Sequence, residues 1–153
     1  MKLSAREDIK APLDRVYASL VDFDALELQG LRRGLSIDRI EPSMAGELGL
    51  AWQVGFDFRG KARLARAEVT ELRPGKAVSF QASGRDYSCQ GGVELTGLAP
   101  CLTRMHVTVN MLPETFKARL VLFCMGFAKG LFSRRFKARV KSFAHRLLDV
   151  AGP

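Results

Sequence analysis

Two histidines, two tyrosines and three cysteines are the side chains of this sequence best suited to catalysis. Their spacing does not form an arrangement typical of an enzyme. His106 falls on the polar positions of an alternating segment and His145 on the polar side of a helical one, so each is expected to face solvent. Tyr17 and Tyr87 could place a hydroxyl in a cavity, but buried tyrosines usually hydrogen-bond to the backbone. The sequence therefore assigns no catalytic residue.

Metal and cofactor motifs are also missing from the sequence. Cys89, Cys101 and Cys124 are odd in number and show no metal-binding spacing, so we expect free thiols in a reducing, cytoplasmic compartment. The chain has no Walker loop, no G-x-S-x-G and no H-E-x-x-H motif. Asp57 and Glu68 lie in segments of strand character without a partner at diagnostic spacing. We predict no metal and no cofactor.

Large apolar side chains at alternate positions are the more informative pattern. Trp52, Val54, Phe56 and Phe58 alternate with less apolar residues, which predicts a half-buried strand. A bent sheet wrapped around a helix can enclose an apolar cavity, and such cavities are the usual sites for small molecules. A filled core is the alternative. The predicted contacts of a small hydrophobic ligand are Trp52, Phe56, Phe58, Phe80, Tyr87, Met105 and Met125.

The order of predicted elements defines the fold class. A strand over 2–10 is followed by two short helices between Pro12 and Gly34, by six strands between Leu35 and Met111, and by a helix over about 114–149. Short turns join successive strands, so an antiparallel sheet of about seven strands is expected, covered by the long helix. The paired glycines 91–92 predict a bulge or a sharp bend. We interpret residues 1–153 as one α+β domain.

The positive charge of the chain is concentrated near its C-terminus. The formal net charge is +8, and from Pro113 onward nine basic residues face only two acidic ones. This segment could meet an anionic membrane surface, or it could be a solvated helix face. Nucleic acid is not expected, because the basic helix lacks an aromatic platform or a reading motif. The longest apolar run, Leu120 to Ala128, is too short to span a bilayer, and no signal peptide is expected.

Two apolar stripes run along the predicted C-terminal helix. The stripe expected to face the sheet contains Ala118, Met125, Phe132, Phe136, Phe143 and Leu147. The second stripe covers only the first half of the helix and then becomes polar; it contains Phe116, Leu120, Phe123, Phe127 and Leu131, followed by Arg134 and Lys141. We favour intramolecular packing for this second stripe. A ligand, a second subunit in a homodimer, or lipid could cover it instead. Gly126 and Gly130 indicate tight packing or a bend.

Several short motifs resemble those of a known superfamily. They are Ile9-Lys10-Ala11-Pro12, Phe23-Asp24, Trp52, Phe56-Asp57-Phe58-Arg59-Gly60-Lys61, the segment from Val69 to Gly75, Leu102-Thr103-Arg104, and Arg134-Arg135-Phe136-Lys137. With the order of elements, they resemble the START-like superfamily, and within it the bacterial SRPBCC group of polyketide cyclase/dehydrase and lipid-transport proteins. The resemblance implies a helix-grip fold, in which a curved sheet surrounds the C-terminal helix and leaves a hydrophobic cavity between them.

The resemblance implies a function in outline only. Members of the superfamily bind lipids, sterols, polyketides, plant hormones or quinones, and a minority catalyse cyclisation. We therefore expect non-enzymatic binding or transport of a small hydrophobic ligand, such as a lipid, a quinone or a polyketide-like molecule. The alternatives are a cyclase or dehydratase acting in the same cavity, and a protein-interaction module that uses the Phe116–Leu131 stripe. A cyclase needs acid–base groups aimed into the cavity, and the sequence does not supply a convincing set.

Overall fold

A computed structural model describes the backbone of residues 1–58 and 60–151, and the side chains of these residues except 58 and 148–151. The helices are α1 (Leu13–Leu20), α2 (Phe23–Arg32), the short 3₁₀ helix η1 (Pro42–Met44), α3 (Phe116–Gly126) and α4 (Lys129–Ala151). The strands are β1 (Lys2–Ile9), β2 (Ser36–Arg39), β3 (Ala51–Phe58), β4 (Lys61–Arg73), β5 (Ala77–Ser83), β6 (Tyr87–Ala99) and β7 (Leu102–Pro113).

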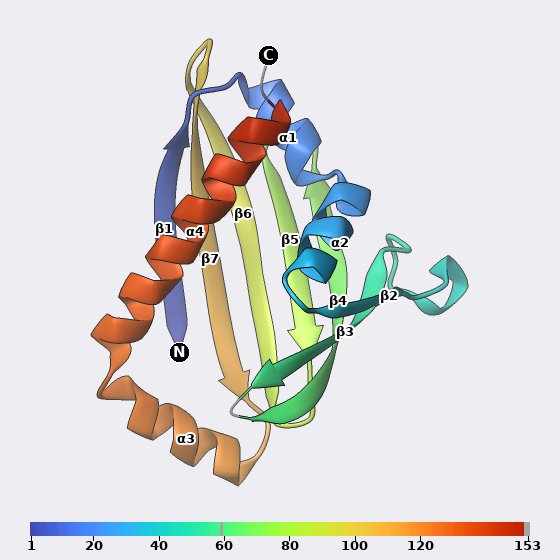
Figure 1. Cartoon of the computed structure of the whole chain (residues 1–153), viewed down its shortest axis with the longest axis vertical. Helices are drawn as coiled ribbons and strands as arrows, with labels where there is room; N and C mark the ends of the chain where they lie inside the picture. Colours follow the sequence, from blue (N-terminus) through green and yellow to red (C-terminus); the bar gives the residue numbers. More distant parts are fainter. Residues whose placement is uncertain (59, 152–153) are drawn as a thin grey trace.

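The seven described strands form one antiparallel sheet in the order β1-β7-β6-β5-β4-β3-β2. Figure 1 shows the curved sheet with α4 crossing it diagonally, α1 and α2 on the same side as α4, and α3 at the opposite end of the molecule from α1. The predicted α+β helix-grip fold is confirmed: a curved sheet of seven strands, a long C-terminal helix, and two short helices after the first strand.

The C-terminal segment forms two helices, so the prediction of one helix over about 114–149 is wrong. α3 ends at Gly126 and the long helix, α4, begins only at Lys129. The two residues between them donate their backbone N–H groups to carbonyls three residues earlier, which is the tighter hydrogen bonding of a helix end. Glycine is about 1 kcal/mol less favourable than alanine inside a helix, and Gly126 and Gly130 flank the break. A Cβ at either glycine would meet no other side chain within 4 Å, so this pair marks a bend and not tight packing.

The core lies between α4, α1 and the β1–β7 side of the sheet, because α4 packs on β1 and on α1. Leu147 of α4, Val16 of α1 and Met105 of β7 are almost completely buried there. The hydroxyl of Thr103, also buried, donates a 2.9 Å hydrogen bond to the carbonyl oxygen of Ala11. This bond ties β7 to the connection between β1 and α1, so the first helix is fixed over the end of the sheet.

The glycine pair in β6 does not form the predicted bulge. Gly91 and Gly92 pair with consecutive residues of β5 and β7 without a change in register. Register shifts occur instead between Val69 and Glu71 in β4, and near the end of β6. Bulges increase the local twist of a strand, so these two positions help the sheet to curve.

Truncating the core side chain of α4 tests its packing. We expect Leu147→Ala to lower the free energy of unfolding by about 3 kcal/mol, the usual effect of leaving a cavity at a buried leucine. Leu131→Ala, at a position of the same helix that is 46% exposed, is the matched control and should change it by less than about 0.5 kcal/mol. Urea unfolding followed by circular dichroism measures both values. Equal effects of the two substitutions would contradict the packing of α4 on the sheet.

Candidate functional site

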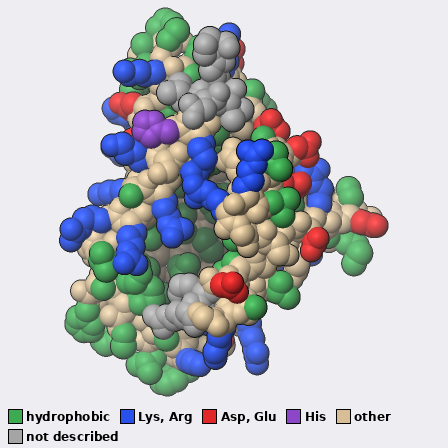
Figure 2. Space-filling view, in the orientation of Figure 1, with side chains coloured by type: hydrophobic (Ala, Val, Ile, Leu, Met, Phe, Trp, Pro, Cys, Tyr) green, Lys and Arg blue, Asp and Glu red, His purple; other side chains and the backbone are tan. Residues whose placement is uncertain are grey.

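Two adjoining pockets occupy the concave face of the sheet. The helix-covered pocket lies beneath α2 and α4 and has a volume of about 430 Å³. The hairpin pocket lies between the β3–β4 connection, the β5–β6 connection and the start of α3, and has a volume of about 870 Å³. Val54 and Ala67 line both pockets, so the two pockets adjoin, and together they are called the groove. The space-filling view shows a hollow between α4 and α2, with apolar side chains inside and basic side chains around it (Figure 2).

The helix-covered pocket is almost entirely apolar. Its walls come from α2, from α4 and from the positions of the strands that share the concave face. Representative lining residues are Phe23, Trp52, Val69, Phe80, Val93 and Phe143. Two charged residues complete the lining, Glu27 from α2 and Arg139 from α4. A ligand in this pocket would therefore lie against apolar atoms, with charge available only from the two helices.

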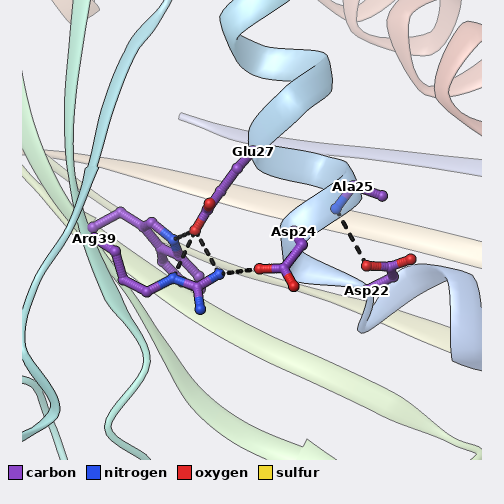
Figure 3. A network of polar contacts seen from close by, with 6 residues as sticks. Asp22, Asp24, Ala25, Glu27 and Arg39 are labelled. Carbon is purple, nitrogen blue, oxygen red and sulfur yellow. Dashed lines mark hydrogen bonds and ion pairs between the residues drawn. The ribbon is translucent and has the colours of Figure 1, made fainter.

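A polar network fixes α2 against β2 and β3 (Figure 3). The indole N–H of Trp52 donates to Oε1 of Glu27 at 2.5 Å, and Nε of Arg39 donates to the same oxygen at 2.8 Å. Arg39 also pairs with Asp24 at 2.8 Å, and the Phe23 and Trp52 rings lie 5.4 Å apart. The hydrogen bond to Glu27 raises the pKa of the Arg39 guanidinium, so this cation stays charged beside its carboxylates. The network neutralises Glu27 and orients the single tryptophan of the chain in the pocket wall.

The start and the end of α2 follow from local chemistry. The side chain of Asp22 caps the helix by accepting the N–H of Ala25 at 3.2 Å, and Asp24 adds negative charge to the first turn (Figure 3). Arg32 lies in the last turn, and Gly34 follows with a positive φ of 87° that a residue with a side chain rarely adopts. The charges of α2 are therefore segregated, with acidic groups at its beginning and basic groups at its end.

The hairpin pocket combines an apolar floor with a charged rim. Its floor includes Phe56, Ala82, Tyr87, Cys89 and Met111, and its rim includes Lys61, Arg85 and Lys117. Arg63 pairs with Asp86 across the rim at 3.8 Å. Burial raises the pKa of the Cys89 thiol, so it stays protonated at neutral pH and is a poor nucleophile.

Small side chains in β4 and β5 account for the volume at the centre of the groove. Ala67 lies directly opposite Ala82 across the two strands, and Ala65 is two positions away on the same face. Larger apolar residues at these positions would fill the space between the sheet and the helices. These alanines are not among the ligand contacts predicted from the sequence, although their alternation in β4 indicates that one stretch of the concave face carries little side-chain volume.

The seven ligand contacts predicted from the sequence do not all lie in the groove. Four of them line the groove: Trp52, Phe56, Phe80 and Tyr87. Met105 is completely buried and lines neither pocket, because it belongs to the core cluster that also contains Val16 of α1 and Leu147 of α4. Met125 lies in α3, beyond both pockets, because the helix break turns α3 away from the line of α4. The side chain of Phe58 falls outside the described residues.

The histidines and the strand carboxylates considered for catalysis lie outside the groove, whereas Tyr87 and Cys89 line the hairpin pocket. Asp57 is exposed, and Glu68 accepts a 2.5 Å hydrogen bond from Gln81 on the other side of the sheet from Trp52. His145 is exposed on α4, and His106 pairs across the sheet with Arg6 without lining either pocket. The carboxylates that do border the groove, Glu27 and Asp86, are each held by an arginine.

The second apolar stripe is exposed, so the intramolecular packing favoured for it is wrong. Phe116 is 83% exposed, Phe123 is 70% exposed and Phe127 is 85% exposed, and Leu120 and Leu131 are exposed as well. Of the α3 side chains, only Ala118 is buried, because α3 contacts the end of β7 and little else. Arg134 and Lys141 are exposed on α4. No helix in the described part of the chain is both long enough and apolar enough to cross a membrane.

Solved structures with the same fold extend over nearly the whole chain. The protein TTHA0849 from Thermus thermophilus has a TM-score of 0.65 and 18% identity, with 99% of this chain and 97% of that chain covered. The Zhui aromatase/cyclase from Streptomyces sp. R1128 has a TM-score of 0.63 and 14% identity, covering 99% and 90%. A START superfamily protein from Mycobacterium smegmatis has a TM-score of 0.57 and 12% identity, covering 91% and 96%.

These similarities establish a START-like fold, as the sequence motifs predicted. No protein-family model matches the chain, and no curated protein matches it. Because the identities are below 20%, these similarities establish the backbone arrangement alone. The ligand has to be inferred from the residues of the groove.

The position of the Phe80 ring depends on a glycine, which gives a testable prediction. A Cβ on Gly91 would lie 2.5 Å from the carbonyl oxygen of Thr108 and 2.9 Å from the Phe80 ring. We expect Gly91→Ala to lower the free energy of unfolding by about 2 kcal/mol, because the backbone oxygen has to move. Gly126→Ala, where a Cβ meets nothing within 4 Å, should be neutral or stabilising by up to about 1 kcal/mol. Chemical denaturation of the two variants measures this difference, and a stable Gly91→Ala protein would contradict the described contact.

Proposed function

We propose that the protein binds and carries a small hydrophobic ligand in the groove between the sheet and α2 and α4. The observation that carries this proposal is the pair of adjoining pockets on the concave face of the sheet, of about 430 and 870 Å³, the first almost entirely apolar and the second with an apolar floor. These volumes suit a drug-sized or lipid-sized molecule. A lipid, a quinone or a polyketide-like compound fits this description.

The energy of binding would come mainly from apolar burial. At about 25 cal/mol per Å², burying about 300 Å² of apolar ligand surface contributes about 7.5 kcal/mol. Loss of translational and rotational freedom opposes this contribution, so apolar burial of this size by itself corresponds to an affinity weaker than micromolar. The Glu27–Arg39–Trp52 network keeps the pocket wall in place before the ligand arrives, which lowers the cost of ordering.

Binding is favoured over a cyclase or dehydratase activity by the state of the polar groups at the groove. Glu27 and Asp86 are engaged by Arg39 and Arg63, and the Cys89 thiol is held in its neutral form by burial, which raises its pKa. A general acid or base needs a free group within hydrogen-bond reach of the substrate. Tyr87 is the groove residue on which an enzymatic alternative would have to rely.

The ligand can be sought directly in the purified protein. Native mass spectrometry of the full chain should show a stoichiometric adduct, and denaturing extraction should release a small molecule of lipid, quinone or polyketide type. Conversion of that molecule by the protein on incubation would support the enzymatic alternative instead.

Filling the centre of the groove should abolish binding. We expect Ala67→Phe to reduce the affinity for the apolar dye Nile red at least about tenfold, since the new ring occupies the space that joins both pockets. Energy transfer from Trp52, the only tryptophan, reports dye bound in the groove. Ala138→Phe, at an exposed position of α4, is the control and should bind like the parent protein. If the dye binds Ala67→Phe unchanged, the groove is not the site.

We further propose that the exposed apolar residues of α3 dock the protein on an anionic membrane. Phe116, Phe123 and Phe127 leave a large apolar surface in water, which monomeric proteins rarely tolerate without a partner. The segment from 115 to 148 contains nine basic residues and no acidic one, so its charge complements anionic lipid. Each basic residue near such a surface adds about 1 kcal/mol to the free energy of membrane binding, and the phenylalanine side chains would insert into the bilayer interface. A homodimer through the same surface is the competing outcome.

Vesicle binding tests the docking surface. The protein should co-sediment with vesicles of phosphatidylcholine and phosphatidylglycerol in a roughly 3:1 ratio, and much less with phosphatidylcholine alone. The double variant F123S/F127S should lose at least about tenfold in vesicle affinity. Leu64→Ser, which removes another highly exposed apolar side chain from β4, should not. If the measured molecular mass of the protein doubles as its concentration rises, and the F123S/F127S variant stays monomeric, the surface is a homodimer interface and not a membrane-docking surface.

A further inference from the structure

Three arginines of α4 and of the end of α2 lie at or near the helix-covered pocket, and one of them lines it. Arg139 lines the pocket from α4. The Arg146 guanidinium, two turns further along the same helix, lies 5.9 Å from the centre of the Phe143 ring, which also lines the pocket. Arg33, at the C-terminal end of α2, is close enough to Arg146 for their charges to interact. Figure 2 shows basic side chains on both sides of the hollow between these two helices.

The guanidinium of Arg146 has one hydrogen-bond donor without a partner among the described residues. This donor, Nε, is buried. Burial, with repulsion from Arg33, moves the pKa of Arg146 below its usual range. An unpaired buried donor normally costs about 1–3 kcal/mol, and native proteins rarely leave one without a reason.

The neighbouring carboxylates, Glu27 and Asp24, form their hydrogen bonds and ion pairs with Arg39 and Trp52 and not with these three arginines. Glu27, which borders the same pocket, already accepts hydrogen bonds from Trp52 and Arg39. Asp24 pairs with Arg39 as well. No ion pair within the described residues includes Arg33, Arg139 or Arg146. Among the residues whose side chains are described, nothing therefore compensates the positive charge on the side of the apolar pocket between α2 and α4.

We propose that the ligand is an anionic amphiphile, whose head group lies between α2 and α4 against Arg146, Arg33 and Arg139, and whose apolar chain lies in the groove. This inference rests on the proposed binding function and specifies its ligand class. A carboxylate or phosphate group accepts hydrogen bonds from the planar guanidinium in a geometry that a neutral hydroxyl cannot match. An anion at this position would also relieve the repulsion between Arg33 and Arg146.

Equilibrium dialysis with two ligands of the same chain length tests the head group. The full-length protein is dialysed against radiolabelled dodecanoate or dodecan-1-ol at about pH 8, below their aggregation limits, with acetate as an anion without a chain. Dodecanoate should bind about tenfold more tightly than the alcohol, the effect of one charge-assisted hydrogen bond. Arg146→Met, which keeps much of the length of the side chain, should remove most of this preference while leaving the affinity for the alcohol unchanged.

Two further variants make the result specific. Lys141→Met removes one charge from the exposed side of α4 and should keep the tenfold preference. Arg139→Met, at the exposed edge of the pocket, should weaken it, and it provides the test if Arg146→Met unfolds. Equal affinity for acid and alcohol, or a preference that survives in both arginine variants, would overturn the inference while leaving hydrophobic binding intact. Tight binding of acetate would overturn it as well, because it would show an anion site without a chain site. If neither dodecyl compound binds, the proposed function itself fails.

Discussion

The concave face of the sheet carries more apolar surface than the helices of the chain cover, and the groove exists because of this mismatch. α4 packs on β1 and α1, which closes the core at one side of the sheet. On the other side, Arg39 and Trp52 hold α2 against β2 and β3 through Glu27. Each helix is thus fixed to a different edge of a curved surface, and alanines 65, 67 and 82 leave the space between them unfilled.

The distribution of charge follows the same division of the fold. Acidic groups at the beginning of α2 are used internally, by the N-cap and by Arg39. The nine basic residues of α3 and α4 lie in the segment from 115 to 148, which contains no acidic residue, and most of them face solvent or the groove. A low-dielectric groove beside cations that have no ion-pair partner among the described side chains concentrates positive potential where a ligand would approach. The proposed ligand, an anionic amphiphile, and the proposed anionic bilayer would each complement this potential and the apolar surfaces next to it.

Periodicity and turns are local signals, which is why the fold could be predicted from the sequence. Alternation in β3 and the positions of Pro12 and Pro113 located the strands and the helices to within a few residues. The break between α3 and α4 could not be located, since the two flanking glycines cost too little to interrupt a helix by themselves. Met105 was wrongly predicted to line the cavity. Alternation identifies the apolar face of a strand, but it does not show which part of that face a helix covers. The arginine cluster joins α2 to α4, which lie far apart in the chain, so no sequence window contains it.

The break in the C-terminal helix connects the two proposed surfaces of the protein. An unbroken helix would extend the line of α4 beyond the sheet, whereas the bend at 127–128 sets α3 across the end of the groove, where Lys117 lines the hairpin pocket. Thr115 caps α3 and Ala118 is its one buried side chain, so few contacts hold the helix in position. A helix with apolar residues on nearly all sides and little packing has its lowest free energy in an apolar environment. The proposed membrane contact and the access to the groove would therefore involve the same short helix, so docking at a bilayer would bring the open end of the groove to the source of an amphiphilic ligand.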